Sequence, residues 1–420
     1  MRVVLVTAGE PLPTDRADIR LHRTGQFAAW LAARGHEVDW VTNRFDHFQK
    51  QQRPTAGVLH LAPNYRIHLL ESRGYRRNIS IERFLDHADL GRDFRARASQ
   101  LGRADVMLAA MPTIELAAES VRWAQSVGAA SLVDIRDLWP DIMIERAPIG
   151  ARWLARLALS KLSGTLARAL RGADGIIAQN EPFVHWGLAH AQRAAGPLDL
   201  VIPLGYELRP LAEADRAAAL QFWRNHGLDL GDSAPPVMAF AGSVSSQFDF
   251  TPVLAAGNQL RSRGVRTVIC GIGERVGELN SAAQSRSDLL LPGWCSYAQL
   301  RVLLERSTIG LLPYKDSVNF QNAVPNKAGE YLAHGLPLAW SLGTGPLAAL
   351  ISKHNVGCSY GKDGTQLAAA VTTLLESPAK ATAAHDAARA LFHAEFDADS
   401  VHQRLLDHLT LAAQRRSAAA

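Results

Sequence analysis

The strongest constraint on the fold is a regular alternation of short β-branched segments with longer helical segments. Predicted strands of the first half occupy 3–7, 38–42, 67–70, 106–109, 131–135, 175–178 and 200–203, and those of the second half occupy 237–241, 266–270, 289–291, 309–312 and 338–341. Predicted helices lie between them. This alternation is typical of parallel sheets with helices on both faces. We therefore expect an α/β fold.

The alternation starts again after GLDLGDSAPP (227–236), whose Gly, Asp, Ser and Pro residues favour a break in regular structure. A chain of 420 residues is also too long for one ordinary core. We therefore predict two Rossmann-like, doubly wound domains facing a cleft, over 1–205 and 236–399, with a linker region over 206–235. A final helix over 400–416 is expected to pack back on the first domain.

Composition narrows the class of protein. Apolar residues make up 47% and charged residues 20%, as in soluble globular proteins, and no apolar run reaches the roughly 18 residues of a spanning helix. Three cysteines without metal-binding spacing indicate reduced thiols and a cytoplasmic protein. The net charge of +5 lies wholly in residues 1–205, with 26 Lys+Arg against 21 Asp+Glu. That excess permits an anionic partner there but is too small to indicate nucleic acid.

Glycines and other turn residues follow several predicted strands of the second domain. In open α/β sheets, ligands bind beyond the carboxyl ends of the strands. Glycine at such positions lets backbone N–H groups approach an anion closely, although any βα turn favours Gly. The candidate ligand-binding residues at these turns are Gly242, Ser243, Gly271, Gly293, Trp294 and Pro313.

Lys327 and Glu330 lie three residues apart in the segment NAVPNKAGEYLAHGLPLAW (322–340), which predicts a helix from about 326 to 334. A helix N-terminus favours phosphate, and Lys327 could reach the same phosphate. Glu330 would instead accept hydrogen bonds from the hydroxyls of a ribose. A phosphate beside a sugar indicates a nucleotide. The alternative is a plain surface ion pair.

Two other motifs are weaker. GIGERVG (271–277) resembles a dinucleotide fingerprint, but it follows the second strand of its domain, and its third Gly is one residue late. We therefore do not expect NAD. Asp397 and Asp399 form a D-x-D, a metal motif of a different fold, but they precede the last helix and are expected to be capping and surface acids.

The second half resembles the family 4 retaining glycosyltransferases, which have the GT-B fold. The resemblance rests on P-x-K-x-x-E-Y-L-A-x-G-x-P at 325–337 and on FAGSV, CGIGE, LPGW and LLPY in the family's order. It extends over nearly the whole chain through RTGQFAAWLAARGHEVDWVT (23–42). RFDHFQK (44–50), YRRNISIERFLD (75–86) and DIRDLWPD (134–141) resemble enzymes of bacterial surface polysaccharides, with N-acetyl-fucosamine-type transferases the nearest subgroup.

The resemblance implies transfer of a hexosyl or N-acetylhexosaminyl group from a nucleotide-sugar, expected to be UDP-linked, with retention and without a metal or cofactor. It places Glu330 on the ribose and Lys327 with Gly242 and Ser243 on the diphosphate. Asn326 and Asn322 would also border the donor. The chain departs from the family at Asn322, where many members have Glu, and in SVSSQFDF (243–250), which lacks the usual Arg and Lys.

The first domain is expected to bind the acceptor, a lipid-diphosphate-linked sugar or another glycan of O-antigen, capsule or exopolysaccharide synthesis. Asp134, Arg136 and Asp137 follow a buried strand in DIRDLWPD. Asp137 or Asp134 could orient the acceptor hydroxyl and Arg136 could meet its phosphate. The alternative is a structural ion network. His22 and Arg23 are further candidates for acceptor binding.

Two basic segments suggest a peripheral position on the inner face of the cytoplasmic membrane. Residues 73–103 hold eight Arg against four acids, and 151–171 predicts a basic amphipathic helix. The alternative for the second is an ordinary helix packed on the sheet. Two further functions stay open: an inactive GT-B subunit that partners an active transferase, and a sugar-nucleotide 2-epimerase on the same fold.

Overall fold

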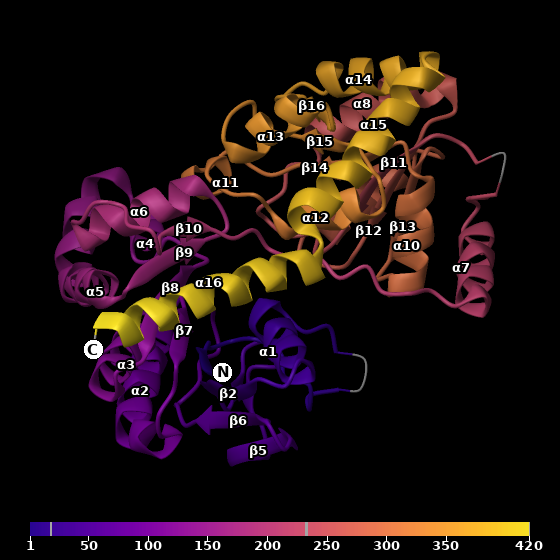
Figure 1. Cartoon of the computed structure of the whole chain (residues 1–420). Helices are drawn as coiled ribbons and strands as arrows, with labels where there is room; N and C mark the ends of the chain where they lie inside the picture. Colours follow the sequence, from indigo (N-terminus) through magenta and orange to yellow (C-terminus); the bar gives the residue numbers. More distant parts are fainter. Residues whose placement is uncertain (17–18, 232–233, 420) are drawn as a thin grey trace. The chain divides into compact units, whose positions relative to one another are not determined.

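The computed structural model describes residues 1–16, 19–231 and 234–419. The chain forms two compact units, which we call unit 1 (Met1–Pro203 with His402–Ala420) and unit 2 (Leu204–Val401). Each unit has the α/β architecture expected from the sequence, with helices packed against a mainly parallel sheet (Figure 1).

The sheet of unit 1 has the strand order β10-β9-β8-β7-β1-β2-β6-β5. Every neighbouring pair is parallel except β5 and β6 at one edge. Its strands are β1 (Arg2–Val6), β2 (Glu37–Asn43), β5 (Gly57–Ala62), β6 (Tyr65–Leu70), β7 (Val106–Ala110), β8 (Ala130–Ile135), β9 (Gly175–Ala178) and β10 (Leu200–Val201). A separate hairpin pairs β3 (Phe45–Asp46) with β4 (Gln51–Gln52).

The helices of unit 1 are α1 (Arg23–Ala33), α2 (Ile81–Arg97), α3 (Ile114–Val127), α4 (Asp141–Arg146), α5 (Arg152–Gly172), α6 (Glu181–Ala191) and most of α16 (Ala398–Ala419). Helices α2, α3 and α5 pack side by side. The His402 ring of α16 lies 5.5 Å from Phe27 and 5.7 Å from Trp30 of α1 (ring centroids). These contacts bring the end of the chain onto unit 1.

The sheet of unit 2 has the order β13-β12-β11-β14-β15-β16 and is fully parallel. Its strands are β11 (Val237–Ala241), β12 (Arg266–Cys270), β13 (Leu289–Gly293), β14 (Ile309–Leu312), β15 (Leu338–Trp340) and β16 (Gly357–Ser359). The order of the strands reverses between β11 and β14. In a doubly wound sheet this switch point opens a crevice at the carboxyl ends of the two strands.

The helices of unit 2 are α7 (Glu213–Asn225), α8 (Thr251–Leu260), α9 (Val276–Ala283), α10 (Tyr297–Arg306), α11 (Val318–Gln321), α12 (Asn326–Ala333), α13 (Pro346–His354), α14 (Thr365–Glu376) and α15 (Pro378–Leu391). Helix α7 falls within the segment predicted as linker, 206–235. Its Trp223 is fully buried in the core of unit 2, and the indole N–H donates to Gln299 O at 2.9 Å. Part of this segment is therefore integral to unit 2.

All predicted strands are present within two residues of their expected ends. The sequence interpretation missed β3, β4, β5 and β16, which are short or, in β5, half-exposed at an antiparallel edge. No helix within residues 1–16, 19–231 and 234–419 combines the length and the apolar character that crossing a membrane requires.

Candidate functional site

Helix α12 places Lys327 at the switch point of the unit 2 sheet. The Lys327 Nζ donates to Ala241 O at the end of β11, and it lies 5.0 Å from the ring centroid of Phe240 and 5.9 Å from that of Phe248. The ammonium is thus held at the crevice by a carbonyl and two aromatic rings. This is where the sequence predicted a phosphate-binding cation.

The local sequence explains why α12 begins and ends where it does. Pro325 lies in extended backbone before the first turn and has no N–H that the helix could use. Gly335, with φ +67°, follows the helix and its N–H donates to Leu332 O at 2.9 Å. Lys327 therefore lies in the first turn of α12, and a helix N-terminus favours an anion.

Tyr331 anchors α12 to both strands of the switch point. Its hydroxyl accepts the N–H of Ala241 at 3.0 Å and lies 3.4 Å from Leu311 O. The side chain is fully buried, and burial raises the pKa of Tyr331 well above its ordinary value, so the phenol stays protonated. The sequence interpretation did not single out this positioning residue, although a buried Tyr one residue after Glu330 could have indicated it.

Glu330 lies one turn after Lys327 and is half-buried. The Tyr206 hydroxyl lies 3.5 Å from its Oε1. Because residues three apart share one helix face, the carboxylate and the ammonium point to neighbouring parts of one surface. A carboxylate in this position can accept hydrogen bonds from hydroxyl groups.

Two of the glycine amides that we expected to bind an anion are engaged within the protein instead. The Gly242 N–H donates to Cys270 O at 2.9 Å, and the Gly271 N–H donates to Gly293 O at 2.7 Å. A Cβ on Gly242 would lie 1.7 Å from Lys327 Nζ, and one on Gly271 would lie 1.8 Å from Gly242 O. These glycines therefore permit close packing of the turns and of Lys327. Ser243, which is exposed, is the turn residue still able to meet a ligand.

The other predicted donor residues differ in availability. Trp294 is 68% exposed and offers a flat apolar surface beyond β13. Asn326 is exposed on the first turn of α12. The Pro313 carbonyl accepts the N–H of Asp249 at 2.7 Å, and the Asn322 amide donates to Val318 O at 2.8 Å. The Pro313 carbonyl and the Asn322 amide therefore already form hydrogen bonds within unit 2.

In unit 1, Asp134 and Arg136 form the ion network that was the alternative interpretation. Asp134 is buried, and its Oδ2 lies 2.8 Å from Arg136 Nε and 3.0 Å from Arg23 Nε. Arg136 also pairs with Glu10, and its Nη2 donates to Thr24 Oγ1 at 2.9 Å. Burial alone would raise the pKa of Asp134, but the two guanidinium groups lower it. These expected acceptor-binding groups, including Arg23, are engaged within the protein.

Asp137 lies in a different environment. It is half-buried, and burial raises the pKa of its carboxyl group, while Arg83 and Arg146 partly offset that effect. A carboxyl group of this kind can exchange a proton or accept one hydroxyl. Asp137 is therefore the member of DIRDLWPD that fits a ligand-facing role.

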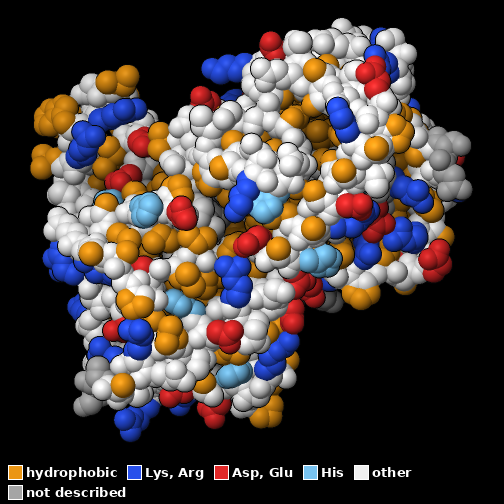
Figure 2. Space-filling model, turned by 45° about the horizontal axis from the view of Figure 1, so that its top comes forward, with side chains coloured by type: hydrophobic (Ala, Val, Ile, Leu, Met, Phe, Trp, Pro, Cys, Tyr) orange, Lys and Arg blue, Asp and Glu red, His pale blue; other side chains and the backbone are white. Residues whose placement is uncertain are grey.

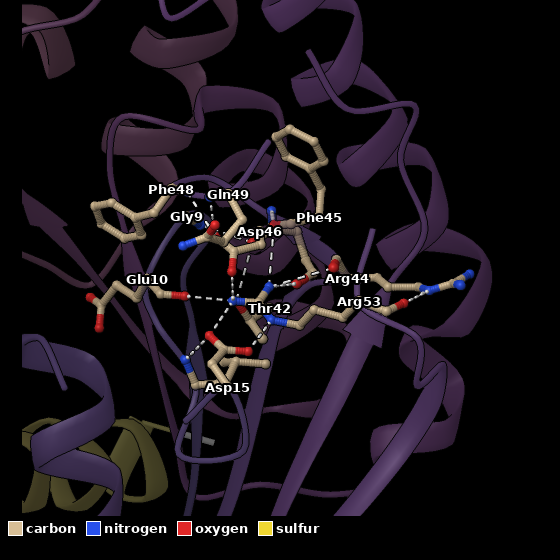
Figure 3. Close-up of polar contacts among 12 residues, drawn as sticks. Gly9, Glu10, Asp15, Thr42, Arg44, Phe45, Asp46, Phe48, Gln49 and Arg53 are labelled. Atoms are coloured by element: carbon tan, nitrogen blue, oxygen red, sulfur yellow. Dashed lines mark hydrogen bonds and ion pairs between the residues drawn. The ribbon is translucent and has the colours of Figure 1, made fainter. Parts of the chain in front are cut away.

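A cavity of about 620 Å³ opens in unit 1 beside His22. Its floor is Arg53, which is buried and donates to Asp15 Oδ1 at 2.6 Å and Asp15 Oδ2 at 2.7 Å (Figure 3). Phe48 is 55% exposed at its rim, 5.6 Å from the His22 ring. The other described lining residues are Pro11, Thr14, Arg16, Ile19, Arg20, Asp46, Gln49, Gln51, Pro54, Thr55, Leu59 and Leu69.

Arg53 is fixed by more than Asp15. Its Nη1 lies 3.2 Å from both Asn43 O and Phe45 O, and its Nη2 lies 3.4 Å from Glu10 O. Figure 3 shows these groups converging on the guanidinium. Arg53 thus ties the loop after β1 to the loop after β2 and shapes the cavity. Sequence reasoning missed it, since no motif marks an Arg whose partners are mostly carbonyls.

Groups of side chains that could bind a metal were sought among the acidic, histidine and cysteine residues. In the part of the chain that the structure describes, His, Cys, Asp and Glu side chains form no group of three or more that could hold a metal ion. Asp397 of the D-x-D motif caps α16, since its Oδ2 accepts the Ser400 N–H at 3.0 Å.

Comparison with known proteins places these sites in context. Residues 235–377, in unit 2, match the model of the family described as glycosyl transferases group 1. A search of curated proteins gives no match. Three solved structures align with nearly all of both chains.

Sucrose-phosphate synthase from Thermosynechococcus elongatus has a TM-score of 0.71, 18% identity and 100% coverage of each chain. HepE from Anabaena in complex with UDP has a TM-score of 0.64, 12% identity and coverage of 97% of this chain and 99% of that one. WaaG, a glycosyltransferase involved in lipopolysaccharide biosynthesis, has a TM-score of 0.62, 15% identity and coverage of 98% and 100%. At these identities the likeness shows the fold, which is GT-B.

Proposed function

From the glycosyl transferases group 1 domain at residues 235–377 and the GT-B fold of the chain, we propose a retaining glycosyltransferase that uses a nucleotide-sugar, most simply a UDP-sugar. The observation that carries the proposal is the pair of Lys327 and Glu330, with Lys327 Nζ held at the end of β11. The structural neighbour HepE is described in complex with UDP and with UDP-glucose, which supports this donor class.

In the proposed reaction, the donor diphosphate lies against the α12 N-terminus and Lys327, and the ribose hydroxyls donate to Glu330. The bond from the anomeric carbon to the phosphate oxygen breaks, and a bond to the acceptor oxygen forms on the same face. The acceptor proton passes to the leaving phosphate. Lys327 stabilises charge as it develops on that phosphate. Asp137 would orient the acceptor hydroxyl. The proposal includes no resident metal or cofactor.

Turnover separates this proposal from an inactive GT-B subunit. The intact chain is incubated with UDP-, GDP- and CMP-linked sugars, with and without lipid-diphosphate-linked acceptors, and free nucleotide is measured. We expect release from one donor that rises when an acceptor is added. No release from any donor, in protein that binds the free nucleotide, would favour the inactive subunit. Inversion of configuration at C2 of the donor sugar would favour the epimerase.

Removing the Glu330 carboxylate should weaken nucleotide binding. Charge-assisted hydrogen bonds contribute about 1.5–3 kcal/mol each, so Glu330→Ala is expected to raise the Kd for UDP at least roughly tenfold. Titration calorimetry on the intact chain measures the change. Glu213→Ala, which removes an exposed carboxylate from α7, is the matched control and should leave the Kd unaltered. Equal Kd values in wild type and Glu330→Ala would remove Glu330 from the donor site.

For the acceptor we propose a lipid-linked sugar or another glycan of O-antigen, capsule or exopolysaccharide synthesis, with the chain at an anionic membrane surface. The later turns of α5, the predicted basic amphipathic helix, do not support this, because their Leu166 and Leu170 are buried. The support lies at the start of α5 and just before it, where Ile149 (83%), Trp153 (62%), Leu154 (50%) and Leu157 (67%) are exposed. Figure 2 shows hydrophobic and basic side chains gathered at the upper left, the side where Figure 1 labels α5.

Membrane binding through this segment can be tested with Trp153→Ser/Leu157→Ser. Each apolar side chain contributes about 1.5–3 kcal/mol when it leaves water, so the variant should bind vesicles at least roughly tenfold more weakly. Sedimentation with phosphatidylglycerol vesicles measures it, and Leu411→Ser, an exposed residue of α16, is the control. Unchanged binding of the double variant would contradict membrane docking here.

A further inference from the structure

Two cations converge on one aromatic ring among the loops of unit 1. The Lys50 Nζ lies 4.6 Å and the Arg83 Cζ 5.4 Å from the ring centroid of Tyr75. Lys50 Nζ donates to Asn78 Oδ1 at 2.5 Å, and Arg83 Nη1 donates to Asn78 O at 2.9 Å. The groups come from the β3–β4 hairpin, the loop after β6 and the first turn of α2. The segments that follow the carboxyl ends of the neighbouring strands β2 and β6 therefore bring these side chains into one small cluster.

Within the described residues, no ion pair joins Lys50 or Arg83 to a carboxylate. The nearest acids are otherwise engaged. Asp46 Oδ1 accepts two backbone N–H groups of the following residues, at 2.7 and 2.9 Å. Asp86 accepts the Gly74 N–H at 2.7 Å, and burial raises the pKa of Asp86, which disfavours its charged form. Two like charges held close together, neither in an ion pair with a carboxylate of the described residues, favour an incoming anion.

The cluster also has an unused donor. The Arg83 Nε is buried and has no hydrogen-bond partner. His47 adds no charge near pH 7, since burial lowers its pKa to about 4, and its Nδ1 lies 2.5 Å from the Tyr75 hydroxyl. That contact fixes the ring under the two cations. An oxyanion that contacts both the Lys50 ammonium and the Arg83 guanidinium would receive charge-assisted hydrogen bonds from both side chains.

We propose that Lys50 and Arg83, over the ring of Tyr75 and beside Asn78, bind a phosphate-type anionic group of the acceptor. This inference rests on the proposed function, because it assigns the anion to the acceptor of sugar transfer. The positive charge of Arg83 also lowers the pKa of Asp137, against the larger effect of burial. The acceptor phosphate would therefore lie near the carboxylate proposed to orient the acceptor hydroxyl, which selects acceptors whose hydroxyl is close to a phosphate or diphosphate.

Pyrophosphate is the probe, titrated into the intact chain already saturated with UDP so that the donor site is filled. Titration calorimetry compares wild type with Lys50→Asn/Arg83→Gln; Asn suits position 50 because its φ is +56°. We expect wild type to bind pyrophosphate and the double variant to bind at least roughly tenfold more weakly. Arg77→Gln removes an exposed cation from the same loop and should change binding less than about twofold. Lys50→Asn alone covers the case in which the double variant does not fold.

The outcomes separate the two proposals. Failure of wild type to bind UDP would be a failure of the proposed function. Normal UDP binding without pyrophosphate binding would overturn the anion subsite alone. An equal loss in Arg77→Gln would also overturn it, since general positive charge would then explain binding. Binding of glucuronate in preference to pyrophosphate would replace phosphate with a carboxylated sugar and overturn the assignment.

Discussion

Lys327→Ala is expected to lower kcat for sugar transfer by roughly 100-fold, or about 3 kcal/mol of transition-state stabilisation. The reason is that Lys327 Nζ, held at the end of β11, would contact the proposed leaving phosphate. Nucleotide release from the active donor measures the effect. KM for the donor should change less than kcat, because charge on the phosphate grows as the bond breaks.

The control for Lys327→Ala is Lys353→Ala, which removes an exposed Lys from α13 of the same unit. It should leave kcat unchanged. Because Lys327 also contacts Phe240 and Phe248, thermal unfolding should be recorded for both variants to exclude a loss of folded protein. A folded Lys327→Ala with kcat within threefold of wild type would show that this amine does not act on the leaving group.

Asp134→Ala should destabilise unit 1 by about 3–5 kcal/mol, because removing one member of a buried ion network leaves its partners uncompensated. Asp134 is 1% exposed, and its carboxylate is shared by Arg23 and Arg136. Two compact units need not unfold in one transition, so the suitable measurement is hydrogen exchange of the β1 and β8 amides. We expect their exchange to quicken roughly 100- to 4,000-fold, since about 1.4 kcal/mol corresponds to a factor of ten.

Asp137→Ala supplies the matched control three residues away. This carboxyl group belongs to no ion pair within the described residues, and burial already disfavours its charge. Its removal should change stability by less than about 1 kcal/mol while lowering transfer. If Asp134→Ala and Asp137→Ala had equal effects on exchange, the division of DIRDLWPD into a structural and a ligand-facing carboxylate would be wrong.

Local sequence predicted the elements well where one cause dominates. The buried parallel strands are continuous apolar segments, so β1 and β11 could be placed directly. The ends of α12 followed from Pro325 and Gly335, whose backbone restrictions act without tertiary help. Strand β5 was missed because it is an antiparallel edge strand with only partial burial, which leaves a weak pattern.

The candidate sites were harder to predict where partners are distant in sequence. The glycine turns suggested free amides, but whether the Gly242 N–H is free depends on Cys270, 28 residues later. Likewise, the spacing in DIRDLWPD gives no sign that Glu10 and Arg23 complete its network. The sequence alone could predict that Lys327 and Glu330 lie on one face, because both belong to a single helix and are three residues apart.

The central claim is that unit 2 binds a nucleotide, and thermal unfolding of the intact chain with UDP, GDP, CMP and ADP tests it most directly. A ligand at about 100 times its Kd adds roughly 2.7 kcal/mol of stability, which is readily measured. We expect one nucleotide, most simply UDP, to raise the unfolding temperature clearly above the others. If none of the four raised it, the account of Lys327 and Glu330 as a nucleotide-sugar site would be contradicted.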